Sequence, residues 1–248
     1  MMTLRDNTIL ITGGGSGIGR GLAEELFRLG NTVIIAGRRE SALQQVCEAN
    51  PGMQYQVMDI SDIDSLADIA RQLTARFPAL NMLINNAGVQ YPEDLTHPEP
   101  HKMLTSIATN LTGPMILTSA LLPHLLAARA GAVINVTSDL AFMPYTAVPA
   151  YCAAKAGLHS WTESLRFQLA ASALRVIEIT PPMVQTDLHG SKDGSIAMGL
   201  DQFVSEVMAL LQSGEPLKEI NVERSKLFRF AERNGQYDEV FLALNTRH

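Results

Sequence analysis

The fold is decided near the start of the chain, where an apolar run leads into the glycine-rich stretch Thr12-Gly13-Gly14-Gly15-Ser16-Gly17-Ile18-Gly19. Residues 7–12 have the apolar, β-branched character of a buried strand, and residues 17–29 have the pattern of a helix. Glycines let such a turn approach a ligand closely, and the helix that follows directs free N–H groups at bound phosphates. A glycine-rich loop without a ligand is the alternative, but the position between a strand and a helix favours a nucleotide-binding loop.

Outward from this stretch, short apolar runs alternate with longer amphipathic ones. The expected strands are residues 7–12, 32–36, 53–58, 80–85, 132–138, 174–180 and 219–222. The expected helices are residues 17–29, 40–49, 61–76, two within 98–129 that meet near 110–114, 148–170, 201–212 and 225–244. We therefore predict a single α/β domain over residues 1–248. Its Rossmann fold has a doubly wound, parallel, seven-stranded sheet with helices on both faces.

Composition limits the classes of partner. The 248 residues are 46% hydrophobic and 18% charged, with a net charge of -6, which argues against a nucleic-acid partner. The apolar stretch 114–128 is too short to span a bilayer and is interrupted by Pro123 and His124. Cys47 and Cys152 form no C-x-x-C motif, and we interpret them as structural thiols. We expect a cytoplasmic protein without a membrane partner.

The spacing T-G-x-x-x-G-x-G resembles that of the short-chain dehydrogenase/reductase family. Three further motifs carry the resemblance: Asn85-Asn86-Ala87-Gly88, Tyr151-Cys152-Ala153-Ala154-Lys155 with Ser138 upstream, and Asn110 within Thr109-Asn110-Leu111-Thr112-Gly113. A lone Tyr-x-x-x-Lys is common on ordinary helices. The order and spacing of all four polar residues after a matching cofactor loop favour catalysis.

The resemblance implies a set of cofactor-binding residues. In the first loop these are Gly13, Ser16, Gly17, Ile18 and Gly19. Asp59 would bind the adenine amino group and Ile60 would pack on its ring, although Asp59 is also a plausible helix-start residue. The adenosine ribose would lie on Asn86, Ala87 and Gly88. Tyr151 and Lys155 would contact the nicotinamide ribose, and Val184 and Thr186 would hold the carboxamide.

The residues after the second strand bear on the choice of cofactor. NAD-specific relatives carry an acidic residue there, whereas this chain has Gly37 followed by Arg38 and Arg39. A guanidinium binds a 2′-phosphate that a carboxylate would repel, so we predict NADP(H), with NAD(H) as the alternative. The alternative is that both arginines are solvent-exposed charges at the start of the next helix. Two cations at a helix N-terminus oppose the helix dipole, which argues against this alternative.

The expected chemistry is hydride transfer between nicotinamide and a carbonyl or alcohol. Tyr151 would be the acid/base, and because a free tyrosine has a pKa of about 10, Lys155 would have to lower it. Ser138 would polarise the substrate carbonyl. The resemblance implies that Asn110 holds a local helix distortion and a water that connects Lys155 to solvent.

Other segments depart from the family pattern. Pro181-Pro182 stands where relatives have Pro-Gly. Together with the 188–199 segment and the closing Arg-Phe-Ala-Glu-Arg stretch, it resembles the subgroup of oxidoreductases named after lipoteichoic-acid D-alanylation gene clusters. We expect residues 188–199 to form a substrate lid, with a surface loop as the alternative. An apolar pocket would be lined by Phe142, Met143, Tyr145, Gln90 and Tyr91.

Two other interpretations compete with an active reductase. A non-catalytic NADP(H)-binding sensor has no need of Ser138, Tyr151 and Lys155. Nucleotide-sugar epimerases of the extended branch have a T-G-x-x-G-x-x-G spacing that differs from this one. We predict no metal site, because Pro98 and Pro100 disrupt the helix between His97 and His101. We expect a homodimer or homotetramer through the long helices after the fourth and fifth strands.

Overall fold

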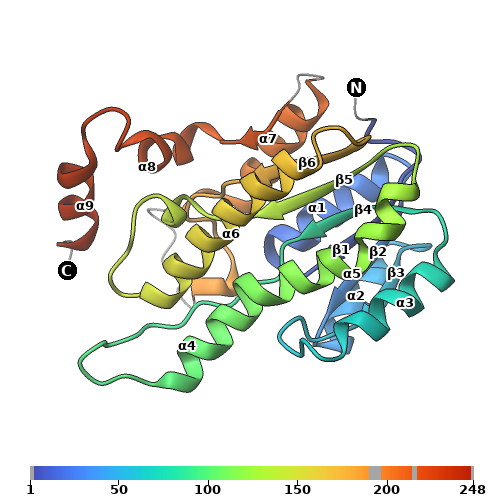
Figure 1. The fold of residues 1–248 in the computed structure, drawn as a ribbon, viewed down its shortest axis with the longest axis horizontal. Coiled ribbons are helices and arrows are strands. Elements are labelled where there is room, and N and C mark those ends of the chain that lie inside the picture. Colours follow the sequence, from blue (N-terminus) through green and yellow to red (C-terminus); the bar gives the residue numbers. More distant parts are fainter. Residues whose placement is uncertain (1–2, 190–196, 214–216, 247–248) are drawn as a thin grey trace.

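The computed structural model describes residues 3–189, 197–213 and 217–246, and it contains one parallel seven-stranded sheet (Figure 1). Its order is β3-β2-β1-β4-β5-β6-β7, so the direction of winding reverses between β1 and β4. The strands are β1 (Thr8–Thr12), β2 (Thr32–Gly37), β3 (Gln54–Val57), β4 (Leu80–Asn85), β5 (Gly131–Val136), β6 (Leu174–Ile179) and β7 (Glu219–Ile220). The predicted fold class is confirmed, and ligands of such sheets bind beyond the carboxyl ends of the strands near the reversal.

Helices cover both faces of the sheet (Figure 1). They are α1 (Gly17–Arg28), α2 (Glu40–Ala49), α3 (Leu66–Arg76), α4 (Pro100–Ile107), α5 (Gly113–Ala127), α6 (Pro149–Gln168), α7 (Leu200–Gln212), α8 (Lys226–Phe230) and α9 (Tyr237–Asn245). None of the described helices combines the length and apolar character needed to cross a membrane.

Alternation of side chains along β1 divides the core into two layers. Ile9 and Ile11 pack in one buried cluster with residues of α1, α2 and α7. Leu10 points the other way, into a cluster with residues of α3, α5 and α6. Because both faces are buried, the strands consist of apolar runs, which is why the sequence pattern located them.

Some boundaries differ from the expected ones. The fifth strand ends at Val136 instead of residue 138, and the seventh is limited to Glu219–Ile220. The helix expected over 225–244 is divided into α8 and α9, because Gly235 adopts a left-handed φ of 70° between them. Most of the expected lid, residues 190–196, lies outside the described residues. Before it, Asp187–His189 forms a 3₁₀ helix.

The two helices expected within 98–129 are α4 and α5, and a π-helical turn (η1, Ala108–Thr112) joins them. π-Helical turns are rare and occur mostly at functional sites. This turn contains Asn110, whose side chain is fully buried. The sequence thus located the junction, whereas the π geometry became visible only in the structure.

Candidate active site

The first loop and the Asn85–Gly88 motif hold each other at the reversal of the sheet. Thr12 Oγ1 accepts hydrogen bonds from the backbone N–H groups of Asn86 and Ala87, both at 3.0 Å. Asn86 Nδ2 donates to Thr12 O at 3.0 Å. A Cβ on Gly19 would lie 2.3 Å from Asn86 Nδ2 and 2.4 Å from Gly13 O, so a larger residue there would separate the two motifs.

A cavity opens beside these motifs. Of the predicted cofactor-binding residues it is lined by Gly13, Ser16, Arg38, Arg39, Ile60, Ala87 and Gly88. Gly17 and Ile18 open α1, so the free N–H groups at this helix start lie next to the cavity wall formed by Ser16. Glycine walls, a helix N-terminus and two guanidinium groups fit the pyrophosphate and phosphate groups of a dinucleotide.

The two arginines at the cavity have different partners. Arg39 Nη2 donates to Ser16 Oγ at 3.2 Å. Arg38 Nη1 lies 3.9 Å from Asp59 Oδ2, and both side chains are substantially exposed. Asp59 Oδ1 also accepts from the N–H and hydroxyl of Ser61, at 2.9 and 2.7 Å. Asp59 therefore stabilises the turn with Ser61, as expected for a residue at a helix start, and its second oxygen is directed toward Arg38.

The expected catalytic side chains meet beyond the carboxyl end of β5. Tyr151 lies in the first turn of α6, is buried, and hydrogen-bonds to Ser138. Lys155 lies one turn further on, with its Nζ 5.7 Å from the centroid of the Tyr151 ring. That Nζ donates to Val136 O at 2.8 Å. The structure thus brings Ser138, Tyr151 and Lys155 together.

Asn110 links the π-helical turn to the chain after β4. Its Oδ1 accepts from the N–H of Val89 at 3.2 Å, and its Nδ2 donates to Val89 O at 2.8 Å and to Ser106 O at 2.9 Å. The turn packs against α6, which carries Tyr151. Asn110 therefore ties together the loop after β4 and the turn that supports α6.

Burial governs the ionisation of the two groups on α6. It raises the pKa of Tyr151 above its usual value, and the hydrogen bond with Ser138 opposes this only in part. Burial also lowers the pKa of Lys155 to about 8, opposed by the negative charge of Glu178. The pKa of the phenol is thus displaced in the direction opposite to the sequence expectation, because burial outweighs the hydrogen bond with Ser138. The Lys155 ammonium lies at the ring and makes its hydrogen bond to Val136 O.

The segment after β6 folds back over the first loop. Val184 is buried and forms an isolated parallel bridge with Met198. A Cβ on Gly17 would lie 3.2 Å from Thr186 Cγ2, so Thr186 lies against the start of α1. Pro181 and Pro182 are both buried, and Pro181 O accepts from the N–H of Asp139 at 2.9 Å.

Two acidic residues that the sequence analysis did not single out also belong to the site. Asp139 follows Ser138 and is buried, and burial raises the pKa of its carboxyl to about 7. Glu93 Oε1 accepts from the N–H of Ala150 at 3.1 Å, which caps the first turn of α6. Adjacency to Ser138 could have indicated Asp139. Nothing local could have indicated Glu93, which is 57 residues from its partner.

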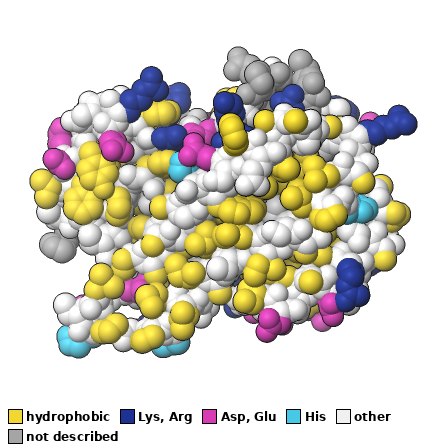
Figure 2. Space-filling view, viewed as in Figure 1, with side chains coloured by type: hydrophobic (Ala, Val, Ile, Leu, Met, Phe, Trp, Pro, Cys, Tyr) yellow, Lys and Arg dark blue, Asp and Glu magenta, His cyan; other side chains and the backbone are white. Residues whose placement is uncertain are grey.

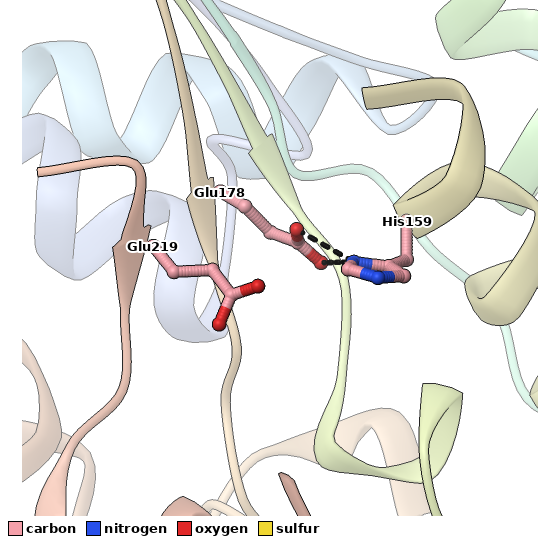
Figure 3. A group of neighbouring side chains, drawn as sticks. All are labelled: His159, Glu178 and Glu219. Carbon is pink, nitrogen blue, oxygen red and sulfur yellow. Dashed lines mark hydrogen bonds and ion pairs between the residues drawn. The ribbon is translucent and has the colours of Figure 1, made fainter. Parts of the chain in front are cut away.

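A polar cluster lies between α6, β6 and β7 (Figure 3). His159, Glu178 and Glu219 place one ligand-type atom each within 4.8 Å of one another, an arrangement that the sequence analysis did not anticipate. The available signal was a glutamate within the apolar strand β6. His159 Nδ1 lies 2.8 Å from Glu178 Oε2, and Arg229 bonds to both oxygens of Glu219 at 2.8 Å. These ion pairs already occupy the atoms that a metal would need.

Phe142, which we expected to line a substrate pocket, packs against this cluster. Its ring packs edge-on against His159, with centroids 4.6 Å apart, and Arg229 lies 4.2 Å from its centroid. Phe142 directly follows the turn Asp139–Ala141, so the cluster contacts the loop after β5 that carries Ser138.

Comparisons with known proteins agree with this architecture. The chain matches the short chain dehydrogenase family over residues 7–195. The oxidoreductase DltE of Bacillus subtilis is 36% identical over 99% of both chains, which confirms the resemblance to the D-alanylation subgroup. An NADP-dependent 3-hydroxy acid dehydrogenase of Schizosaccharomyces pombe is 31% identical over 77% of this chain and 79% of its own.

The fold has close counterparts among solved structures. A short chain dehydrogenase from Burkholderia cenocepacia, solved in complex with NADP, superposes with a TM-score of 0.83. It is 24% identical, and the match covers 99% of this chain and 100% of the other.

Proposed function

The chain belongs to the short chain dehydrogenase family, and we propose that it is an NADP(H)-dependent oxidoreductase that interconverts a carbonyl and an alcohol. The observation that carries the proposal is the group formed by Ser138, Tyr151 and Lys155 beyond the carboxyl end of β5. The cavity itself is lined by the first loop, Arg38, Arg39 and the residues after β4. When bound, the cofactor supplies the hydride that adds to the carbonyl carbon.

The side chains of this chain would handle the proton. Tyr151 donates its O–H proton to the carbonyl oxygen during reduction and receives it back during oxidation. Ser138 binds the same oxygen, where negative charge develops. Lys155 provides the positive charge that counteracts burial and favours ionisation of the phenol. Val184 and Thr186 hold the nicotinamide end, and Asn110 keeps the π-helical turn in place against α6, the helix that carries Lys155.

Preference for NADP(H) is the second part of the proposal. Arg38 and Arg39 lie at the cavity, and Arg39 bridges to Ser16 of the first loop. The 2′-phosphate that distinguishes NADP(H) from NAD(H) would bind to the guanidinium groups of these two arginines. The NADP-dependent relative from Schizosaccharomyces pombe supports this preference.

We also propose that the protein assembles as a dimer or tetramer. Figure 2 shows hydrophobic side chains gathered over the middle of this face, where α5 and α6 lie in Figure 1. Leu126 and Phe167 are exposed at 42% and 84% on these helices. A second copy that covers α5 and α6 would bury this surface.

Paired titrations with NADPH and NADH, followed by a panel of carbonyl substrates, test the function. We expect NADPH to bind at least about tenfold more tightly, which corresponds to about 1.4 kcal/mol. We expect Tyr151→Phe to lower carbonyl reduction by roughly 10²–10⁴-fold while cofactor affinity persists. Tyr237→Phe is the matched control, because the Tyr237 ring stacks on Phe241 within α9 and Tyr237 is not among the predicted site residues. Tight NADPH binding without turnover of any carbonyl or alcohol would favour the sensor instead.

A further inference from the structure

Glu178 is a carboxylate in an otherwise apolar part of the sheet. It lies on β6 between Ile177 and Ile179, and its side chain is 0% exposed. Burying a carboxylate is costly unless partners compensate, and apolar replacements of buried ion pairs are often neutral or stabilising. Stability alone therefore does not account for a glutamate at this position.

Two side chains, Thr137 and His159, hold this carboxylate in place, and Figure 3 shows the second of them. Thr137 Oγ1 donates to Glu178 Oε1 at 2.7 Å. His159 Nδ1 lies 2.8 Å from Oε2 and 3.1 Å from Oε1. Burial disfavours the charged imidazole, but the hydrogen bond and charge of Glu178 more than offset this, so the pKa of His159 is raised.

The end of β5 and helix α6, which supply Thr137 and His159, also hold Lys155. Its Nζ bonds to the carbonyl of Val136, the residue that precedes Thr137. Lys155 and His159 lie four residues apart on α6, on one face of the helix. The ammonium is thus bound to the last residue of β5 and the carboxylate to the residue that follows it, while Lys155 and the carboxylate's second partner, His159, lie on adjacent turns of α6.

We propose that Glu178 is a positioning residue of the active site, whose carboxylate is the buried counter-charge of the Lys155 ammonium and is oriented by Thr137 and His159. The proposal rests on the catalytic role proposed for Lys155. Burial lowers the pKa of Lys155 to about 8, and the charge of Glu178 is what raises it. Without Glu178, the ammonium that acts on Tyr151 would be lost closer to neutral pH.

The other charged groups around the cluster are compensated or distant from its buried part. Glu219 on β7 is paired through both oxygens with Arg229 on α8. Glu163, on the next turn of α6, is 60% exposed and lies 3.7 Å from His159. Asp139, on the loop after β5, acts on Tyr151 and bonds to Ser138. Glu178 is therefore the carboxylate placed to compensate Lys155.

The experiment follows Lys155 directly by NMR in the cofactor-free protein, so it requires neither turnover nor a known substrate. The chain has five lysines, and with ¹³C-labelled lysine the Lys155 signal is identified by its loss in Lys155→Arg. We expect Glu178→Gln, which keeps shape and hydrogen-bonding groups but removes the charge, to lower the Lys155 titration midpoint by roughly one pH unit. Glu163→Gln, the matched control, should leave it unchanged.

An unchanged midpoint in a folded Glu178→Gln variant overturns the proposal, because a merely structural glutamate would not alter the ionisation of Lys155. If Glu178→Gln does not fold, Thr137→Val gives a second test, because it removes the hydroxyl that orients the Glu178 carboxylate. The Lys155 midpoint should again fall, and an unchanged midpoint in folded Thr137→Val overturns the proposal.

A kinetic readout joins the two proposals. In carbonyl reduction, the alkaline limb of the pH–rate profile of Glu178→Gln should move to lower pH by the same amount as the Lys155 midpoint. A shifted midpoint in a protein without any reductase activity would leave the Glu178–Lys155 pairing standing and contradict the proposed function.

Discussion

The site residues at the carboxyl ends of β1, β2 and β4, the cofactor side, are held differently from those around the ends of β5 and β6, the substrate side. At the ends of β1, β2 and β4, most bonds involve the main chain: Thr12 binds two backbone N–H groups, and Gly13 N–H donates to Ala36 O at 2.7 Å. Beyond β5 and β6, side chains do this work, as in Glu178 with Thr137 and His159. The two regions adjoin where β4 pairs with β5, with β1 and β2 on one side of this pair and β6 on the other (Figure 1).

The difference concerns which substitutions each region can accept. Where backbone packs on backbone, there is no space for an added methyl group, and the requirement appears in the sequence as glycine. Where side chains pair, many combinations can satisfy a partner, so relatives can diverge. We therefore expect the cofactor side to accept fewer substitutions than the substrate side.

The largest effect should come from breaking the main-chain contacts. In Gly13→Ala the new Cβ would lie 2.8 Å from Asn86 Nδ2 and 2.9 Å from Ala87 Cα, at a φ of 69°. We expect the free energy of unfolding to fall by about 3 kcal/mol in urea titrations, together with loss of NADPH binding. In the same loop, Gly15→Ala meets only ordinary contacts at 3.4 Å and should retain wild-type stability. Equal losses in both variants would contradict the comparison.

A pH-dependent effect is expected from the substrate side. The pKa of Asp139 is raised to about 7 by burial, so the folded protein favours the neutral acid. This contribution to stability is complete below the unfolded pKa and is lost as the pH rises through 7. Between pH 5 and pH 8 it amounts to a decrease of about 3 kcal/mol, which Asp139→Asn should abolish. Urea unfolding of both proteins at the two pH values measures it, and parallel profiles would show that Asp139 ionises freely.

A smaller effect should follow from removing the cap of α6. Glu93→Ala leaves the N–H of Ala150 without the carboxylate that accepts from it, and we expect a loss of about 1 kcal/mol in thermal unfolding. Glu93→Gln keeps an acceptor oxygen and should lose less. If both variants lose equally, the charge at the helix start matters more than the hydrogen bond.

The smallest effect is expected at the C-terminal helix. Asn245 on α9 accepts from the N–H of Thr146 at 2.7 Å and donates to Pro144 O at 3.1 Å. Asn245→Ala should cost about 1 kcal/mol or less, since both bonds are exposed to solvent. Hydrogen exchange at the Thr146 amide should accelerate in Asn245→Ala. It should stay at the wild-type rate in Thr246→Ala, which removes only a bond within α9.

The sequence predicted most of the fold because its determinants are local. The strands are mostly apolar and β-branched, and the glycines near residue 13 mark a close approach of backbones. The break between α8 and α9 was missed because a helical pattern continues across Gly235, and its left-handed conformation is not visible in periodicity.

Much of the candidate site was also predictable, but its supporting residues were not. Ser138, Tyr151 and Lys155 lie within 18 consecutive residues, so their order and spacing can be read directly from the sequence. The roles of Glu93 and Glu178 depend on partners that lie on other elements and far away in the sequence. The direction of the Tyr151 pKa depends on how deeply the phenol is buried and where Lys155 makes its hydrogen bond, and both are properties of packing.

The contact of Asn245 with the loop before Tyr151 has a consequence for protein synthesis. Domains generally fold as units, while the ribosome extends the chain from its N-terminus. The glycine loop, Ser138, Tyr151 and Lys155 all emerge well before residue 245. A nascent chain therefore carries all of these residues before the domain can complete its contacts, because residues 144–146 acquire two of their hydrogen bonds only when α9 has been translated and released from the exit tunnel.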